Sequence, residues 1–185
     1  MSKVTFEATP NPATMKFYLH RTVTTESFDF SNVSEADISP LASKIFGFPW
    51  TAGVFLGPDF LTVTKQDWVD WDVLAEPLAQ LIENHISSGL PVVDKRDSSN
   101  SNVSDISESD PEVVKRIKRV LNSEIRPVVA MDGGDVEFSH FEDGVVYLRM
   151  RGSCNGCPSS QATLKEGIEV RLKQAVPEIR EVLSI

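Results

Sequence analysis

Two cysteines, three positions apart, are the residues of this sequence best suited to chemistry. Cys154 and Cys157 lie within the segment Gly152-Ser-Cys-Asn-Gly-Cys-Pro-Ser-Ser160, and the 185-residue chain contains no other cysteine. A closely spaced pair of thiols can bind a metal or exchange disulfides, whereas two cysteines cannot form the disulfide framework of a small secreted domain. The pair therefore predicts metal or redox chemistry.

The residues around the pair favour reactive thiolates. Gly152 and Gly156 let the backbone turn sharply beside the sulfurs, and Pro158 suits the first turn of a helix. A helix is expected there because apolar residues recur four positions apart, at Leu164, Ile168 and Leu172. Thiolate is favoured over thiol by the unpaired amides of that helix and by three nearby cations, Arg149, Arg151 and Lys165.

The number of ligands turns the pair into a prediction about assembly. Clusters of the [4Fe–4S] and [2Fe–2S] types are ordinarily held by four cysteine thiolates, and this chain has two. A C2 dimer brings the same loop of each subunit to the axis and supplies all four. We therefore expect Cys154 and Cys157 to bind an iron–sulfur cluster jointly with a second copy of the chain. A site at an interface suits a carrier better than a redox enzyme, and the ligands alone do not choose between the two cluster types.

Three other interpretations of the pair stay open at this stage. A thioredoxin-like dithiol-disulfide oxidoreductase shares the order strand, Cys-x-x-Cys, helix. It usually has an aromatic residue before the first cysteine and a later cis-proline, for which Pro177 lies too close. A zinc site needs four ligands and so requires a dimer or the recruitment of His140. Two structural cysteines without a ligand are the third interpretation, although buried cysteines do not require flanking glycines and a helix start.

The second half of the chain must position the cysteines. A helix is predicted to follow Ser109-Asp110-Pro111, with one apolar face and an opposite basic face that we expect to be solvated, formed by Lys115, Arg116, Lys118 and Arg119. Strands are predicted at 128–131, 136–141 and 145–150. Gly133 and Gly134 should both supply positive φ angles to a tight turn, and Asp143-Gly144 should close a hairpin.

The first half predicts a second small α+β unit. Strands are expected at 14–20, 53–56 and 60–64, the last two forming a hairpin. One helix should begin after the capping residue Ser39, and another near Leu74, because Pro77 restricts its start. His85 is expected on a partly exposed helix face. The aromatic residues are expected mainly in the core, as a set comprising Phe46, Phe48, Trp50, Phe55 and Phe60.

Charge and composition divide the chain and exclude two classes of partner. The net charge is −9; residues 1–92 carry 5 basic and 11 acidic side chains, which gives −6, and residues 113–185 carry 11 and 10, which gives +1. No basic stripe is present, so nucleic acid is excluded, and no apolar stretch reaches the roughly 18 residues of a membrane span. The start of the sequence shows no targeting segment, which predicts a cytoplasmic protein.

We predict two small α+β domains joined by a flexible polar linker. The domains are residues 1–92 and 111–185. Residues 93–110 between them are rich in Ser, Asn and Asp, a composition that cannot bury enough apolar surface to offset the entropy of ordering.

Several motifs together resemble a known family. Gly133-Gly-Asp-Val136, the hairpin from Glu142 to Tyr147, the cysteine segment and Thr163-Leu-Lys-Glu-Gly-Ile-Glu169 are similar to the NifU C-terminal (Nfu) domain, over about residues 111–183. Residues 9–17, 39–42 and 46–65 resemble the N-terminal domain that accompanies Nfu in many bacteria and in mitochondria.

The resemblance implies a function. It implies a [4Fe–4S] carrier or scaffold, not an enzyme, with Cys154 and Cys157 in the ligand positions of the family. The partners implied are a second copy of the chain when the cluster is loaded, apo iron–sulfur client proteins, and upstream cluster-assembly proteins. The N-terminal domain is implied to contact partners. The chain lacks the three-cysteine assembly domain of full-length nitrogenase NifU, so delivery is favoured over primary synthesis of clusters.

Overall fold

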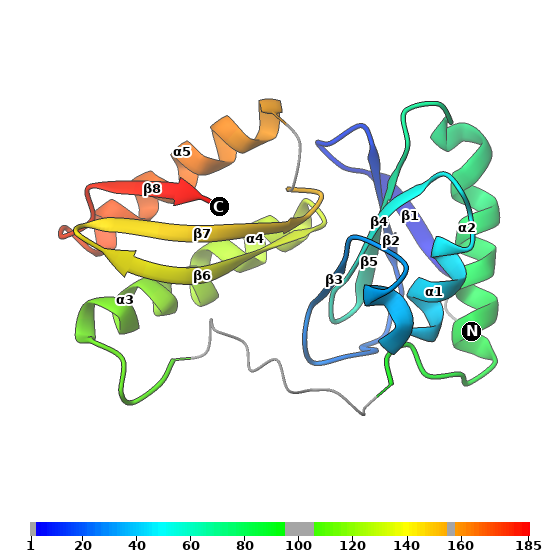
Figure 1. The fold of residues 1–185 in the computed structure, drawn as a ribbon, viewed down its shortest axis with the longest axis horizontal. Helices are drawn as coiled ribbons and strands as arrows, with labels where there is room; N and C mark the ends of the chain where they lie inside the picture. The colour runs from blue at the N-terminus through cyan, green and yellow to red at the C-terminus, as the bar shows by residue number, and fades with distance from the viewer. Residues whose placement is uncertain (1–2, 95–105, 155–157) are drawn as a thin grey trace. The chain divides into compact units, whose positions relative to one another are not determined.

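A computed structural model describes residues 3–94, 106–154 and 158–185, with the side chains of residues 158–164 left out of the description (Figure 1). The chain divides into two compact units, residues 1–100 and 101–185. Each unit combines a sheet with helices, which confirms the α+β class. The predicted linker stays a prediction, because residues 95–105 lie outside the described residues.

The first unit is a five-stranded antiparallel sheet with helices α1 and α2 on one side (Figure 1). The strand order is β1-β2-β5-β4-β3. The side chains of Phe17, Leu61 and Ile82 are fully buried in the core between the sheet and the helices. The elements are β1 (Thr5–Ala8), β2 (Thr14–Tyr18), β3 (Phe28–Phe30), the 3₁₀ helix η1 (Glu35–Ile38), α1 (Pro40–Phe46), β4 (Thr51–Leu56), β5 (Phe60–Lys65) and α2 (Trp71–Ser87).

Most local predictions for this unit are confirmed. β4 and β5 form the expected hairpin, and β2 pairs with β5 in the centre of the sheet. Trp50, Phe55 and Phe60 are buried as expected, whereas Phe48 is exposed. Helix α2, however, begins at Trp71 and not near Leu74. Pro77 removes only the hydrogen bond to the carbonyl four residues earlier, and that residue, Val73, lies at the surface, where water can satisfy it.

Ser39 fixes the start of α1 and ties it to a distant segment. Its Oγ accepts a hydrogen bond from the Ala42 amide at 3.1 Å and donates one to the Val92 carbonyl at 2.6 Å.

We expect Ser39→Ala to destabilise the first unit by about 2 kcal/mol, because the cap is lost and a buried carbonyl is left unpaired. All three tryptophans of the chain lie in this unit, so urea unfolding followed by tryptophan fluorescence measures the effect. Ser34→Ala is the control, because exposed Ser34 precedes η1 without a side-chain cap; an equal loss in both variants would contradict the assignment.

The prediction for His85 is wrong, because this residue is 2% exposed. Its Nδ1 lies 3.0 Å from Lys44 Nζ and its Nε2 lies 3.0 Å from the Pro91 carbonyl oxygen. The ammonium can only donate and the carbonyl can only accept, so the ring is the neutral Nε2–H tautomer. Burial lowers the pKa of His85 below 6.5, and the nearby Lys44 charge lowers it further, against an opposing contribution from the Pro91 hydrogen bond.

The lowered pKa of His85 predicts a pH-dependent stability. The folded state prefers the neutral ring, so this contribution is complete above the unfolded pKa of about 6.5 and is lost as the pH falls below it toward the folded pKa. We expect the urea midpoint of the tryptophan-reported transition to decrease as the pH is lowered below about 6.5. The variant His85→Gln should show a shallower fall over the same range. An unchanged slope in that variant would assign the pH dependence to other groups.

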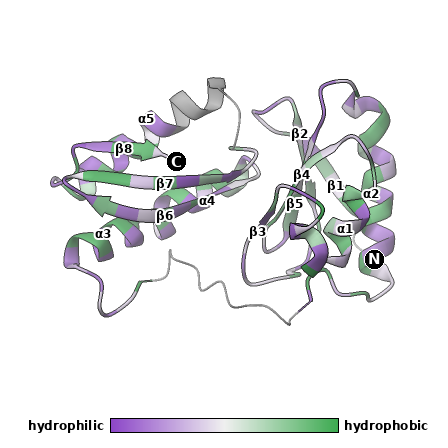
Figure 2. Ribbon diagram, in the orientation of Figure 1, coloured by the Kyte–Doolittle hydropathy of each residue, from purple (hydrophilic) through white to green (hydrophobic). Residues whose placement is uncertain are grey.

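The second unit places helices against a three-stranded sheet of order β6-β7-β8. β6 and β7 are antiparallel, β8 runs parallel to β7, and Asp143 and Gly144 close the β6–β7 hairpin with positive φ angles, as predicted. Hydrophobic and hydrophilic stretches alternate along β6 and β7 (Figure 2). The elements are α3 (Glu112–Val120), the π-helical turn η3 (Leu121–Ile125), α4 (Arg126–Met131), β6 (Gly134–Glu142), β7 (Val145–Gly152), α5 (Pro158–Ala175) and β8 (Glu181–Ser184).

The strand predicted at 128–131 is wrong, because these residues belong to helix α4. The buried residues of this region follow helical spacing, at Ile117, Leu121, Ile125 and Val129. Pro127 cannot donate the next helical hydrogen bond, and the chain widens into the π-helical turn η3 just before it, so the helix continues. A four-residue apolar run does not by itself distinguish a strand from a helix.

The expected solvated basic face of α3 is also only partly correct. Lys118 is buried, and its Nζ lies 2.9 Å from Asp110 Oδ2. Asp110 therefore pairs with a lysine instead of capping the helix, and the hydrogen bond from Lys118 lowers the pKa of its carboxyl group. Arg116 likewise pairs with Glu178, near the end of the chain. Two of the four basic residues thus join segments of the unit together.

Candidate functional site

Cys154 lies directly beyond the end of β7, and Cys157 lies outside the described residues. The Cys154 side chain is 4% exposed and packs with the apolar core of the second unit. Helix α5 begins at Pro158, so the predicted order of strand, cysteine segment and helix is confirmed for the described part. The thiol at this position is held by the fold and does not project freely into water.

Ser153 fastens the cysteine to the turn that precedes β6. Its amide donates a hydrogen bond to the Gly133 carbonyl at 3.3 Å, and its Oγ donates one to the Asp132 carbonyl. Gly133 has a φ of 82° and Gly152 a φ of 65°, conformations that glycine adopts readily and other residues rarely do. The backbone that leads into Cys154 is therefore fixed by Ser153 and by two glycines with positive φ angles, Gly133 and Gly152.

Gly134 has a different role from the one predicted. It does not have a positive φ angle; it is the first residue of β6 and pairs with Gly152 of β7. A Cβ atom placed on Gly134 would lie 2.6 Å from Cys154 Sγ and 2.7 Å from the Arg151 carbonyl oxygen. The sulfur of Cys154 thus occupies the space that a side chain at position 134 would fill. The signal was available in the sequence, since a glycine inside a strand often marks a close approach by another group.

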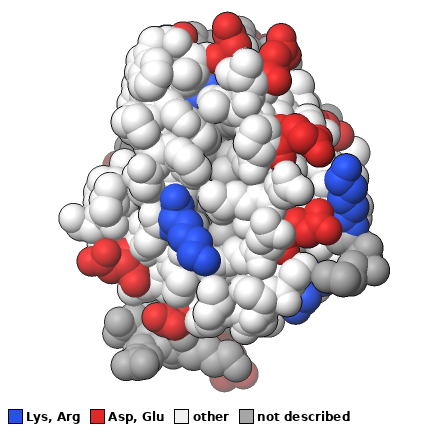
Figure 3. Space-filling view, turned by 90° about the vertical axis from the view of Figure 1, so that its right-hand side faces the viewer, with Lys and Arg blue, Asp and Glu red and all other residues white. Residues whose placement is uncertain are grey.

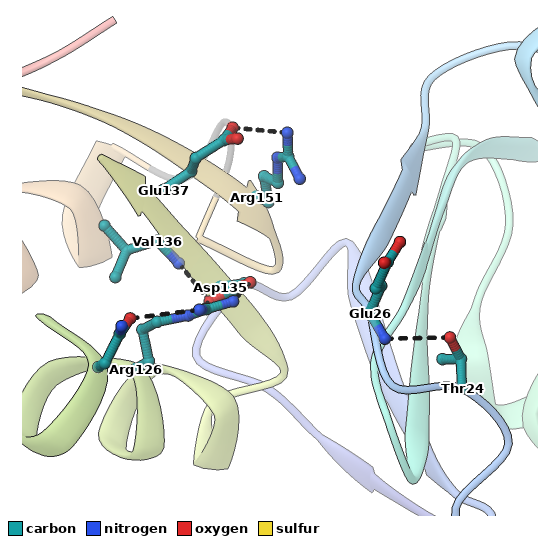
Figure 4. A network of polar contacts seen from close by, with 8 residues as sticks. Thr24, Glu26, Arg126, Asp135, Val136, Glu137 and Arg151 are labelled. Carbon is teal, nitrogen blue, oxygen red and sulfur yellow. Dashed lines mark hydrogen bonds and ion pairs between the residues drawn. The ribbon is translucent and has the colours of Figure 1, made fainter. Parts of the chain in front are cut away.

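A buried ion pair fixes the strand beside this glycine. Asp135 is buried, and its two carboxylate oxygens accept hydrogen bonds from Arg126 Nε at 2.8 Å and Arg126 Nη2 at 2.7 Å (Figure 4). Asp135 Oδ1 also accepts one from the Val136 amide at 2.8 Å. Bidentate pairs of this kind give geometric specificity as well as energy. The pair joins α4 to the start of β6 and so holds Gly134 against the sulfur, a link that sequence analysis missed.

Two of the three cations expected to favour thiolate, Arg149 and Arg151, already pair with a carboxylate. Arg151 Nη2 lies 2.6 Å from Glu137 Oε2 (Figure 4). Arg149 Nη1 lies 4.0 Å from the same oxygen. Both arginines alternate along β7 with the buried Leu148 and Met150, so they lie on the opposite face of the strand from the core that receives Cys154. Glu137 therefore offsets much of the positive charge that we expected to stabilise the thiolates.

His140 lies far from Cys154. It stacks on Tyr147 with ring centroids 4.1 Å apart, six residues along β6 from Gly134, which at strand spacing is roughly 20 Å away. In the described ranges, no three or more His, Cys, Asp and Glu side chains are grouped so that they could hold a metal ion. His140 therefore lies too far along β6 to complete a zinc site with Cys154 of the same chain. Thiolate sulfur remains the donor type at this site, and thiolates select soft metals and iron–sulfur clusters.

Comparison with known proteins identifies the family. A family model described as scaffold protein Nfu/NifU N terminal matches residues 4–89, and one described as NifU-like domain matches residues 117–183. The human protein named NFU1 iron-sulfur cluster scaffold homolog, mitochondrial, is 43% identical over 179 residues, which cover 96% of this chain and 69% of the human protein. The chain belongs to the Nfu family. The resemblance noted from the sequence is confirmed.

Two further members extend the comparison. NifU-like protein 4, mitochondrial, of Arabidopsis thaliana is 44% identical over 179 residues, which cover 95% of this chain but 63% of that protein. This chain thus spans somewhat less than two thirds of the Arabidopsis relative. The solution structure of a NifU-like protein from Saccharomyces cerevisiae is 27% identical, with a TM-score of 0.45, and covers 50% of this chain and 85% of that one.

The prediction of a cytoplasmic protein is wrong. Nfu relatives from a plant, from human and from a fly are all named mitochondrial, which points to mitochondria. The prediction depended on the start of the sequence, and where a sequence begins does not determine the compartment of the protein. Within the described residues, no helix has the length and apolar character needed to cross a membrane.

Proposed function

We propose that this Nfu protein is an iron–sulfur cluster scaffold and carrier and not an enzyme. The observation that carries the proposal is the slot for Cys154, formed by Gly134 and the Ser153 contacts, in the domain that the NifU-like model matches. Relatives are named iron-sulfur cluster scaffold homologs. The cluster is cargo that the chain receives from upstream assembly proteins and gives to apo-proteins.

The ligands of the cluster are Cys154 and Cys157 from each of two chains. A [4Fe–4S] cluster takes four thiolates and each chain contains two cysteines, so one cluster joins a homodimer. The dimer depends on the cluster, because each half-site is incomplete without the other. Release of the cluster then separates the chains, which fits a carrier.

The burial of Cys154 has a consequence for loading. A cluster shared between two chains has to contact a sulfur of each, so the Cys154 thiolate must reach the surface when the cluster binds. The contacts to be rearranged include the hydrogen bonds from Ser153 to Asp132 and Gly133 and the packing of Cys154 in the apolar core. The two hydrogen bonds are neutral, each with a net contribution of only about 1 kcal/mol.

The topology argues against the thioredoxin-like alternative. In the second unit the cysteine segment follows the second strand of an antiparallel hairpin, β6–β7. The thioredoxin-like pattern instead places the motif next to a β-α-β unit. A dithiol-disulfide oxidoreductase is therefore the alternative function that the experiment on cluster carriage has to exclude.

Transfer of the cluster tests the proposal. The chain reconstituted under anaerobic conditions should activate an apo-enzyme that requires a [4Fe–4S] cluster, even when an iron chelator is present. The same amounts of free iron and sulfide should fail in the presence of the chelator, because only a protein-bound cluster is protected. If instead the protein reduces insulin disulfides and gives no activation, the oxidoreductase interpretation is correct.

A further inference from the structure

A groove lies along α2 in the first unit, which contains neither cysteine. It is open, with a volume of about 550 Å³, and it is lined chiefly by Lys44, Pro77, Leu81, Asn84, His85 and Leu90. Pro77, Leu81 and Asn84 follow the helical repeat along one side of α2 and span roughly 10 Å. Lys44 approaches from α1, and Leu90 follows the end of α2. The groove thus combines apolar side chains, an amide and one cation.

The cation of the groove has a neutral partner. Lys44 Nζ donates its hydrogen bond to His85 Nδ1, and the ring of His85 is neutral because Nδ1 must accept this bond while Nε2–H donates to the Pro91 carbonyl. No carboxylate of the described residues lies within 4.0 Å of Lys44 Nζ, whereas many other lysines and arginines of the described chain form ion pairs. An ammonium group has three donors. At least one donor of Lys44 is therefore available to an acceptor that enters the groove.

The walls of the groove are held in place before any ligand binds. Ser88 Oγ donates to the His85 carbonyl at 2.7 Å, and Gly89 ends the helix with a φ of 73°. The hydrogen bond from His85 to Pro91 then fixes the segment that carries Leu90, which is 48% exposed. A preformed site avoids part of the entropic cost of binding.

The charge around the groove indicates what fits it. Lys44 is the only lysine or arginine in the sequences of α1 and α2, and α2 carries the acidic residues Asp72, Glu76 and Glu83. Seen from the side on which α2 lies in Figure 1, acidic side chains lie at several places around a largely uncharged middle, and basic side chains lie both within it and at its right-hand edge (Figure 3). A suitable ligand has one negative group for the centre and positive groups toward the margin.

We propose that the groove binds a short extended segment of a partner protein in which a carboxylate stands beside aliphatic side chains. The carboxylate pairs with Lys44, the aliphatic groups pack on Pro77, Leu81 and Leu90, and the Asn84 amide hydrogen-bonds to the peptide backbone. This site goes beyond cluster carriage. Through it, the first unit contacts a partner without needing a cluster. Peptide binding by the cluster-free chain tests this site, and cluster transfer tests the proposed function, so either can fail while the other holds.

The test uses the full chain without a cluster and the peptide acetyl-Lys-Leu-Asp-Leu-Lys-amide. In ¹⁵N-resolved NMR titrations, we expect shifts of the Asn84 side-chain amide and the Leu90 backbone amide. Changing Asp to Asn in the peptide should weaken binding about tenfold, because a charge-assisted hydrogen bond is lost. Lys44→Met should weaken binding by a similar factor, and Leu90→Ser about threefold through lost apolar contact. Lys65→Met, which removes a cation on β5 outside the groove, should bind like the parent chain.

Three outcomes would overturn the proposal. The Asn peptide could bind as well as the Asp peptide, which would show that the carboxylate is not recognised. Sodium acetate at the same concentration could shift the same amides as strongly as the peptide, which would leave an adventitious anion site only. The two groove amides could also show no shift at millimolar peptide, a concentration that detects even very weak complexes.

Discussion

Replacing Cys154 with alanine is expected to abolish cluster binding. The parent chain should take up about two iron and two sulfide atoms per chain, as expected for one [4Fe–4S] cluster per two chains. With one thiolate left per chain, a dimer offers two of the four ligands, so Cys154→Ala should remain colourless with almost no bound iron. Cys157→Ala should behave in the same way. Iron and sulfide analysis after anaerobic reconstitution and desalting measures the effect.

Two controls separate lost ligands from lost structure. Cys154→Ser keeps the size of the side chain and removes the thiolate, so it should fold and still bind no cluster. Ser139→Ala removes an exposed hydroxyl next to His140, far along β6 from the cysteine, and should bind as much iron as the parent chain. Full iron content in a folded Cys154→Ala variant would show that the cluster is held by other residues.

Gly134→Ala should be the most damaging glycine substitution that the described residues offer near the site. The new methyl group would lie 2.6 Å from Cys154 Sγ and 2.7 Å from the Arg151 carbonyl oxygen, closer than real Cβ contacts allow. The sulfur can leave its slot, but the Arg151 carbonyl oxygen belongs to the paired strand β7, so the two strands must separate at this point. We expect the second unit to lose about 1–3 kcal/mol of stability, the usual range for overpacking, and the cluster occupancy to fall at least severalfold.

Gly167→Ala is the matched control for this substitution. Gly167 is an exposed residue within α5, and a Cβ atom there would meet nothing within 4 Å. Alanine should stabilise the helix by about 0.5–1 kcal/mol and leave iron binding unchanged. Thermal unfolding by circular dichroism gives the stability, and tryptophan fluorescence should stay constant in both variants because it reports the first unit. Parent-like stability and iron content in Gly134→Ala would show that cluster binding does not depend on the close approach of β6 and β7 at Gly134.

Local rules predicted the elements whose signals are short in range. The β6–β7 hairpin depends on Asp143-Gly144, whose positive φ angles suit that turn, and α1 depends on Ser39, whose Oγ accepts from the Ala42 amide. Both signals act within four residues, so the sequence contains them in full. The placement of Cys154 between a strand and a helix was predicted from equally local signals, because Gly152, the cysteine segment and the helix start at Pro158 are adjacent in the chain.

The features that sequence analysis missed depend on contacts between distant segments. Gly134 accommodates a sulfur 20 positions later, and the Arg126–Asp135 pair joins a helix to a strand. His85 was expected at the surface because the residues that bury it and bond to it come from α1 and from the loop after α2. Residues 128–131 were assigned to a strand because their burial, with Val129 inside and Met131 71% exposed, is known only once the helix is packed.

The central claim is that one cluster is shared by two copies of the chain through Cys154 and Cys157. Native mass spectrometry of the anaerobically reconstituted protein, with Mössbauer spectra of the same ⁵⁷Fe-labelled sample, tests it most directly. We predict a dimer of two 20.5 kDa chains that carries a single [4Fe–4S] cluster and dissociates to monomers when the cluster is removed. A single chain that carries a complete cluster, or a dimer whose iron is not in a [4Fe–4S] cluster, would contradict the account.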